Sequence, residues 1–148
     1  MAAEILASFE RQLPGGPCIR MERLRIACHG AGVTVLFGAS GSGKTTVLRA
    51  LAGLDRPDSG RIQFGEEIWF DHDRRIVRPP QERNIGYLAQ DFALFPHLNV
   101  EDNIGYGLRR WPAAERAVRE GEAIQLLGLD GLEKRRPGQL SGGEQQRG

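Results

Sequence analysis

Apolar and polar residues alternate over residues 4–9 and 18–26, and this pattern predicts a pair of β-strands near the start of the chain. Two shorter apolar runs, 61–64 and 68–70, flank Gly65 and predict the strands of a hairpin. The aromatic side chains of this hairpin are expected in the core or on the sheet surface. The first half of the chain should therefore be rich in strands.

Two further runs, 33–37 and 85–88, are mostly apolar, which is typical of strands buried on both faces. Between them, residues 46–52 favour a helix that ends at Gly53. A strand followed by a helix needs a parallel partner strand, reached by a right-handed crossover. We therefore predict a parallel sheet beneath this helix, with 85–88 as the partner of 33–37.

From residue 99 onward the apolar period becomes that of a helix. Asn99 is a good N-cap, and Asp102 follows at the spacing of a capping contact. Pro112 can open a second helix and Gly128 can end it. We thus divide the chain into a strand-rich part, 1–98, and a helical part, 99–148. The small and apolar residues along one face of the second helix are Ala114, Ala117, Val118, Gly121, Ile124 and Gly128.

The composition is that of an ordinary globular domain. The chain has 148 residues, 40% hydrophobic and 26% charged, which allows a sizeable core. Its net charge of +1 gives no general attraction to nucleic acid, so none is expected as a partner. No apolar run is long enough to span a membrane, and no signal peptide is evident. Cys18 and Cys28 lack metal-binding spacing, so we expect both to pack within an intracellular protein.

The most specific pattern is residues 38–46, which fit the phosphate-binding consensus G-x-x-x-x-G-K-[ST] between a predicted strand and a predicted helix. The glycines let backbone N–H groups approach a polyphosphate at the positive end of the helix dipole. Lys44 supplies charge for the β- and γ-phosphate oxygens, and the Thr45 hydroxyl can ligate Mg²⁺. This pattern predicts a nucleoside triphosphate site. Its residues are Gly38, Ala39, Ser40, Gly41, Ser42, Gly43, Lys44, Thr45 and Thr46.

Three further features follow the phosphate loop. Gln90 comes after the predicted strand 85–88, at a sheet edge where ligands bind, and its amide could ligate Mg²⁺ or hold an attacking water. Taken alone, such a glutamine is usually a loop residue. Residues 140–144, Leu-Ser-Gly-Gly-Glu, offer a hydroxyl and flexible amides for a second anion site, or form an ordinary helix cap. Residues 95–98, Phe-Pro-His-Leu, could form a rigid docking surface.

In this order the motifs resemble those of the ATP-binding subunits of ABC transporters. Residues 38–46 resemble the Walker A loop, Gln90 resembles the Q-loop glutamine, and 140–145 resemble the LSGGQ signature with Glu144 at the usual glutamine position. The short separation of the first and last motifs disfavours chromosome-maintenance and repair ATPases, which insert a long coiled coil. A small P-loop kinase is disfavoured by the signature and by the lack of a lid segment.

Finer features resemble importers of small oxyanions and related solutes. Residues 65–71, 79–87 and 90–98 are closest in pattern to molybdate importers, and sulfate, ferric-iron and polyamine importers share much of it. Because these subunits contact the permease and not the solute, the pattern does not fix which solute is carried. A non-catalytic nucleotide-binding or interaction module remains the alternative from another functional class.

The resemblance implies an α/β fold: a P-loop NTPase core with an antiparallel β subdomain and a helical subdomain. It implies ATP and Mg²⁺ as cofactors, with Lys44 and Gln90 in catalytic roles and Thr45 and Gln90 as metal ligands. It also implies a head-to-tail dimer with a second ATPase subunit, transmembrane permease subunits, and a location on the cytoplasmic face of the membrane. The signature residues would contact the partner's ATP; they are Ser141, Gly142, Gly143, Glu144 and Gln145.

Two departures from the family pattern are expected to matter. The Walker B aspartate, the catalytic glutamate and the switch histidine normally follow the signature, so we interpret the chain as a fragment that is inactive alone and lacks the C-terminal part of the core. The aromatic residue that usually stacks on adenine is not evident. Phe9 is a candidate but lies too far upstream, and the expected position falls near residues 13–16, so adenine stacking would be weak or would use an aliphatic platform.

Overall fold

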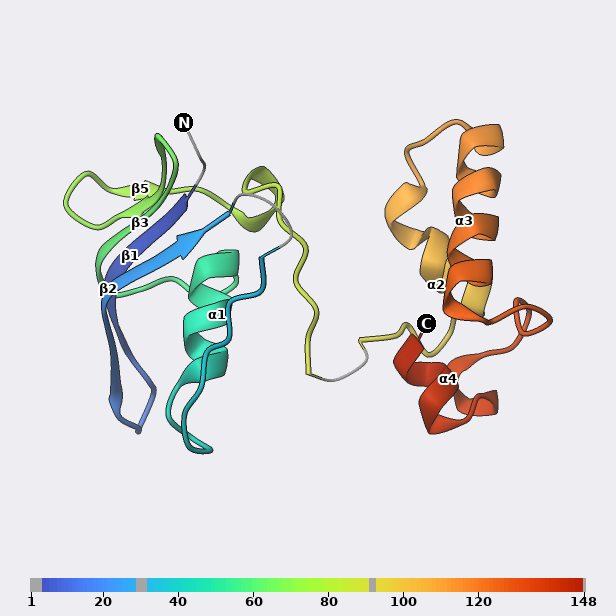
Figure 1. Cartoon of the computed structure of the whole chain (residues 1–148), viewed down its shortest axis with the longest axis horizontal. Coiled ribbons are helices and arrows are strands. Elements are labelled where there is room, and N and C mark those ends of the chain that lie inside the picture. The colour runs from blue at the N-terminus through green and yellow to red at the C-terminus, as the bar shows by residue number, and fades with distance from the viewer. Residues whose placement is uncertain (1–3, 29–31, 91–92, 148) are drawn as a thin grey trace. The chain divides into compact units, whose positions relative to one another are not determined.

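The computed structural model describes residues 4–28, 32–90 and 93–147. The chain falls into two compact units, Met1–Tyr87 and Leu88–Gly148, each of which has its own core. The division between residues 98 and 99 made above stays a prediction. Figure 1 shows the strands and α1 in the first unit and the remaining α-helices in the second.

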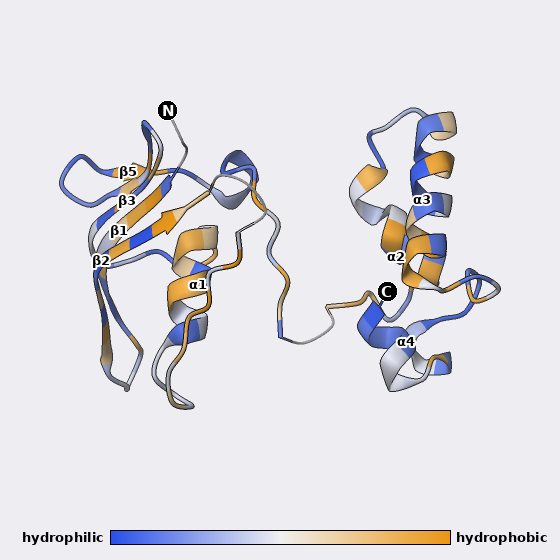
Figure 2. Cartoon of the chain, in the orientation of Figure 1, coloured by the Kyte–Doolittle hydropathy of each residue, from blue (hydrophilic) through white to orange (hydrophobic). Residues whose placement is uncertain are grey.

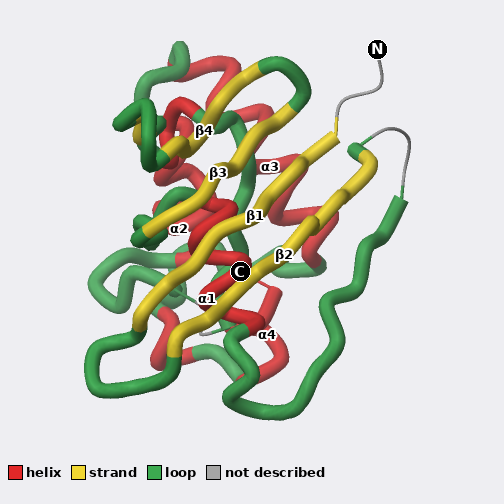
Figure 3. Tube along the Cα trace, turned by 90° about the vertical axis from the view of Figure 1, so that its left-hand side faces the viewer, coloured by secondary structure: helices red, strands yellow, loops and turns green. Residues whose placement is uncertain are grey.

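The first unit contains an antiparallel sheet of five strands in the order β2-β1-β3-β4-β5 (Figure 3). The sequence patterns of its first four strands are confirmed, including the hairpin around Gly65. A 3-10 turn, Pro80–Glu82, follows the sheet. The strands are β1 (Glu4–Gln12), β2 (Cys18–Ala27), β3 (Ser59–Phe64), β4 (Glu67–Asp71) and β5 (Ile76–Val77).

Helix α1 (Lys44–Ala52) packs on one face of this sheet (Figure 1). Its buried side chains, which include Val47 and Leu51, join those of Ile62, Trp69 and Phe70 in one hydrophobic cluster. Trp69 stacks on Phe64 with ring centroids 5.1 Å apart. Burial of these large side chains is the main force that holds the helix on the sheet.

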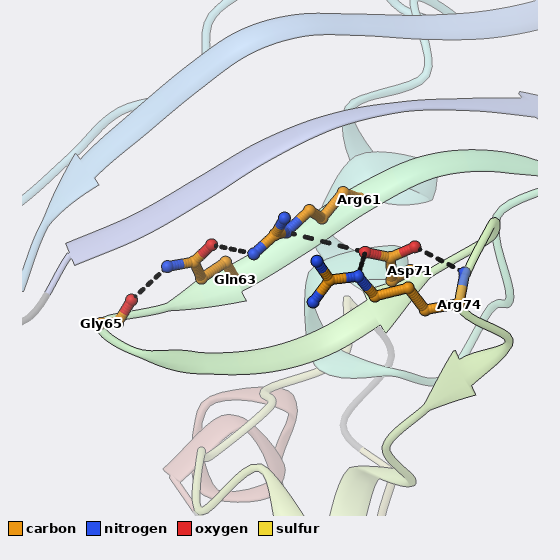
Figure 4. A network of polar contacts seen from close by, with 5 residues as sticks. All are labelled: Arg61, Gln63, Gly65, Asp71 and Arg74. Atoms are coloured by element: carbon orange, nitrogen blue, oxygen red, sulfur yellow. Dashed lines mark hydrogen bonds and ion pairs between the residues drawn. The ribbon is translucent and has the colours of Figure 1, made fainter.

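Ion pairs cross the strands on the opposite, solvent-facing side of the sheet. Asp71 accepts a hydrogen bond from the N–H of Arg74 at 2.9 Å and lies 3.9 Å from the guanidinium groups of Arg61 and Arg74 (Figure 4). Arg61 also donates to Gln63 at 2.8 Å. These contacts pair the buried carboxylate of Asp71 with two exposed arginines on this face and leave the other face for the core.

The two predicted parallel strands are not formed. Residues 33–37 and 85–88 carry no strand assignment, and Val33, Val35 and Phe37 are 88%, 78% and 96% exposed. Figure 3 draws 32–43 as a loop that runs apart from the strands, and Figure 2 colours much of this trace as hydrophobic. A buried strand needs a hydrogen-bonded neighbour, and neither segment pairs with another among the described residues. The prediction of a parallel pair is therefore wrong for this structure.

The second unit is helical. Asn99 caps α2, since its side chain accepts from the N–H of Asp102 at 2.7 Å, and Gly128 ends α3 in the left-handed conformation, as predicted. A small cluster of Val100, Ile124, Leu129 and Leu140 forms the core. The helices are α2 (Val100–Ile104), α3 (Ala113–Leu127) and α4 (Gly142–Arg147), with 3-10 turns at Gly105–Leu108 and Pro137–Gln139.

Most of the small-residue face of α3 does not enter this core. Ala114, Ala117 and Gly121 are exposed, Val118 is 60% exposed, and only Ile124 of that face is buried. Helical spacing shows which residues share a face, but it does not show whether another element covers that face. Only the C-terminal end of α3 packs in the unit's hydrophobic cluster.

Both cysteines are exposed and free, so the predicted packing role is wrong for Cys18 and Cys28. Strand alternation explains Cys18, because the next residue, Ile19, takes the inward position. Among the described residues, the helices are all too short or too polar to cross a bilayer.

Candidate functional site

The predicted phosphate loop forms a turn that leads into the first turn of α1. Gly41 and Gly43 have φ values of 78° and 88°, a region that favours glycine, and Gly43 is the N-cap of α1. The helix then begins with the bond from the N–H of Val47 to the carbonyl of Gly43 at 2.9 Å. The N–H groups of residues 44–46 therefore have no carbonyl of an earlier helical turn to bind, which leaves them available to an anion.

Lys44 closes the loop on itself. Its Nζ donates to the carbonyl of Gly38 at 2.8 Å and to that of Ala39 at 2.7 Å. The N–H of Ser42 binds the same carbonyl of Ala39 at 3.2 Å. An ammonium group has three donors, so two hold the loop in shape and one remains for a ligand. The ammonium thus lies inside the turn, where a phosphate would meet both its charge and the helix N-terminus.

The loop fits tightly against the sheet at one point. A Cβ atom at Gly43 would lie 2.6 Å from Cδ1 of Ile19 on β2, so any larger residue there would displace the loop. Ile19 is buried in the same cluster as Val47 of α1. Strand β2 therefore supports the start of the helix directly.

The other end of α1 is held by Arg83, a residue without a role in the sequence analysis. Nη1 of Arg83 donates to the carbonyls of Ala50 and Leu51 at 2.9 and 2.7 Å, and its Nε donates to that of Arg78 at 3.0 Å. The guanidinium carbon lies 5.5 Å from the ring centroid of Trp69. Arg83 is 4% exposed, although charged side chains are seldom buried.

Burial lowers the pKa of Arg83 to about 10, and the nearby charge of Arg78 acts in the same direction. The group remains charged at neutral pH. Its charge meets the negative end of the α1 dipole and the face of Trp69, both of which favour a cation. The sequence did not point to this residue, because the chain has 20 lysines and arginines and only folding shows which one is buried.

The signature residues form the turn that starts α4. The N–H of Ser141 donates to the carboxylate of Glu144 at 2.6 Å, and the N–H of Glu144 donates to the Ser141 hydroxyl at 3.4 Å. This reciprocal pair is a capping box. The hydrogen bond from the N–H of Ser141 holds the pKa of Glu144 below its ordinary value, and the Ser141 side chain adds to the effect. The glutamate at the usual glutamine position therefore stabilises the local turn.

Gln145 fixes the approach to this turn. Its Nε2 donates to the carbonyls of Pro137 and Leu140 at 2.9 and 3.2 Å. Leu140 is buried in the core of the second unit, whereas Ser141, Gly142 and Gly143 are exposed. The hydroxyl and the glycine amides are thus presented to solvent on an anchored turn.

Gln90 is exposed and lies in an irregular segment. Because 85–88 is not a strand, Gln90 does not follow a strand end as predicted. Thr45 is also exposed, and the described residues contain no cluster of acidic, histidine or cysteine side chains that could hold a metal. Thr45 and Gln90 belong to different units, so their joint role at Mg²⁺ stays a prediction.

The segment after Gln90 is organised by one side chain. Oδ1 of Asn103 accepts from the N–H of Phe95 at 2.8 Å, and its Nδ2 donates to the carbonyls of Phe95 and Asn99 at 3.2 and 2.9 Å. Phe95 also packs on Tyr106, with ring centroids 4.2 Å apart. The predicted knuckle at 95–98 is therefore a fixed structure, while its use in docking stays a prediction.

Comparison with known proteins identifies the family of the chain. The profile of the ABC transporter family matches residues 21–148, and the chain belongs to this family. Its fold is that of the family's cassette: it matches the dimeric structure of MJ0796, a bacterial ABC transporter cassette, with a TM-score of 0.75 and 25% identity. That match covers 97% of this chain and 66% of the other.

A second solved structure, a post-hydrolysis state of the same cassette bound to ADP and Pi, gives a TM-score of 0.74 at 25% identity, with the same coverage. The α/β P-loop class with its antiparallel and helical parts is thereby confirmed, although the parallel pair of strands is not formed here.

The names of similar proteins agree with the resemblance to molybdate importers noted in the sequence. The molybdenum import ATP-binding protein ModC of Rhodospirillum rubrum is 51% identical over 126 residues, and that of Pseudomonas fluorescens is 50% identical over 124 residues. Each match covers 84% of this chain and 34% of the relative. The chain thus spans about a third of the length of these relatives.

Proposed function

We propose that this chain is the nucleotide-binding part of an ABC importer subunit and that it binds ATP through residues 38–46. The observation that carries the proposal is the position of the Lys44 ammonium within the loop, held by two carbonyls beside the N-terminus of α1. A triphosphate there would meet a fixed cation, free N–H groups and the helix dipole together. Chemistry that transfers a phosphoryl group relies on such positioning.

Mg²⁺ and a second subunit complete the proposed site. We infer that Thr45 and Gln90 ligate Mg²⁺, which bridges phosphate oxygens and supplies positive charge. Ser141, Gly142 and Gly143 would then contact the ATP of a second copy in a head-to-tail dimer. The exposed hydroxyl and flexible amides of that turn support this role, as does the dimeric state of the related cassette.

The whole protein is proposed to hydrolyse ATP and to drive import of molybdate or a related oxyanion. Support comes from relatives at about half identity that are named as molybdenum import proteins. Permease subunits would be its membrane partners, which would place it on the cytoplasmic face of the membrane. The knuckle at 95–98, locked by Asn103, offers a firm surface for such contact.

The phosphate site is tested by measuring Mg-ATP binding to the full chain by equilibrium titration. Lys44→Ala removes a charge-assisted contact of about 1.5–3 kcal/mol, so we expect affinity to fall roughly 10- to 100-fold. Lys134→Ala is the matched control, because it removes the chain's other lysine, whose partner is Glu101. Unchanged binding by Lys44→Ala would rule out this loop as the site.

The transported solute is tested in cells. Replacing the importer's own subunit by the Lys44→Ala form of the full protein should abolish uptake of labelled molybdate. Excess unlabelled molybdate should compete with uptake more strongly than sulfate does. If sulfate competes better, the solute assignment is wrong while the ATP site stands.

A further inference from the structure

Helix α1 connects the phosphate loop at one end with Arg83 at the other. Its nine residues span about 13 Å at 1.5 Å per residue, and it is the only α-helix described in the first unit. The loop end rests on Ile19 through Gly43, and the far end is bound through the carbonyls of Ala50 and Leu51. The direction of the helix axis is thus set at two separated points.

The contacts of Arg83 fix the position of its guanidinium group. Its Nη1 donates to two carbonyls of the last turn of α1, its Nε donates to the carbonyl of Arg78, and its guanidinium carbon lies 5.5 Å from the ring centroid of Trp69. A Cβ atom at Gly53 would lie 2.6 Å from Nε of Arg83, so the C-cap glycine leaves room for this side chain. Among the described residues, no carboxylate forms an ion pair with Arg83. The helix end itself is its counter-charge.

Binding of phosphate depends strongly on the direction of α1. The N–H groups of its first turn must lie within the narrow distance range of hydrogen bonds to the phosphate oxygens. A tilt about the Ile19 contact would change the direction in which these N–H groups and the Lys44 side chain point. Hydrophobic contacts of the core hold the helix on the sheet but are not directional, and the hydrogen bonds of Arg83 add a directional restraint on its axis.

We propose that Arg83 is a positioning residue for the phosphate loop: by binding the C-terminal carbonyls of α1 it fixes the direction in which the helix presents its N-terminal amides to phosphate. This inference rests on the proposed nucleotide function, and it names a residue that does not touch the ligand. Lysine cannot replace the arginine fully, because one ammonium nitrogen cannot take the places of both Nη1, which binds the two α1 carbonyls, and Nε, which binds the carbonyl of Arg78.

The test compares Arg83→Met and Arg83→Lys with Arg49→Met in the full chain. Arg49 is a matched control, since it lies on the same helix and its side chain is 42% exposed in a pair with Asp55. Mg-ATP and inorganic tripolyphosphate are titrated well below each variant's unfolding midpoint. We expect affinity for both ligands to fall about tenfold in Arg83→Met, about threefold in Arg83→Lys, and less than twofold in Arg49→Met.

A purely structural role would lower the unfolding midpoint and leave the affinity of the folded molecules unchanged, and that result would overturn the proposal. If Arg83→Met does not fold, Arg83→Lys decides the question by the same criterion. A second measurement needs no nucleotide: Arg83→Lys should shift the amide resonances of residues 41–46, about one helix length away, whereas Arg49→Met should not. If the wild-type chain binds no triphosphate, the proposed function fails, and these resonances still decide the role of Arg83.

Discussion

The two helix starts that the sequence singled out are held in different ways. Helix α1 buries Val47, Ala50 and Leu51 against the sheet, and other elements contact both of its ends. Helix α4 has no buried residue, and its first turn is held by the local pair of Ser141 and Glu144. The phosphate loop is therefore organised by tertiary packing before any ligand binds, while the signature turn is held by its own cap, by Gln145 and by burial of Leu140 just before it.

The cores of the two units also differ, in the size of the side chains that they bury. The first contains large aromatic side chains, among them Trp69 and Phe70, each 1% exposed. The second is a small aliphatic cluster in which only Leu129 is fully buried. Since burial of apolar area is the main stabilising term, the first unit should resist unfolding more strongly. The substitutions below test this difference, from the largest expected effect to the smallest.

Ile62→Ala should destabilise the first unit by about 4 kcal/mol, near the upper end for an enclosed aliphatic side chain. Ile62 is 0% exposed and is enclosed by packed neighbours in a rigid sheet, so the cavity cannot collapse. Urea unfolding followed by Trp69 fluorescence, in a Trp111→Phe background, measures the loss. A change below 1 kcal/mol would contradict the assignment of Ile62 to the centre of this core.

Leu129→Ala should destabilise the second unit by about 3 kcal/mol, because this smaller cluster can relax around the cavity. Hydrogen exchange of the α3 amides measures the loss. The Trp69 signal of the first unit should not change if the two cores are independent. A matched loss in both units would show that they unfold together.

Ser141→Ala should weaken the start of α4 by about 1 kcal/mol through loss of the N-cap. Faster hydrogen exchange at residues 142–147 would report this loss, and Ser141→Asn should restore much of the protection. Because α4 contributes no buried side chain, we expect the thermal midpoint of the chain to change little. A large drop in the midpoint would mean that the cap supports more than its own helix.

Asp55→Asn should have the smallest effect, about 0.5 kcal/mol near neutral pH, since the partly exposed pair with Arg49 is screened by water. The hydrogen bond from Arg49 lowers the pKa of Asp55 below its ordinary value of 3.8, and burial opposes this shift. The stability from this pair is therefore present above about pH 4 and is lost as the pH falls through the folded-state pKa. The urea midpoints of the variant and the wild type should differ at pH 7 and should converge as the pH is lowered to 3. Asp130→Asn is the control, because Asp130 is also exposed to solvent.

Much of the local structure could be predicted from the sequence. The hairpin around Gly65, the cap at Asn99 and the end of α3 at Gly128 all follow from short-range rules of turn and cap chemistry. The phosphate loop was predictable for the same reason, since its glycines and Lys44 act within nine consecutive residues. Such features need no information about distant parts of the chain.

The limits of the sequence patterns have one physical cause. The apolar runs 33–37 and 85–88 predicted strands, but a strand exists only when another strand pairs with it. The face of α3 around Val118 was recognised as a stripe of small residues, and Val118 itself is 60% exposed. In both cases the pattern reports on the segment itself and gives no information about its neighbours.

The sequence by itself determined the family, the phosphate loop and the signature turn, because each depends on residue types at fixed short spacing. Only the tertiary structure decided that Lys44 is held by the loop's own carbonyls and that Arg83, one of many arginines, is buried against the end of α1. The physical reason is that burial and long-range hydrogen bonds depend on which segments meet. The residue types within one segment do not show which distant segments it will meet.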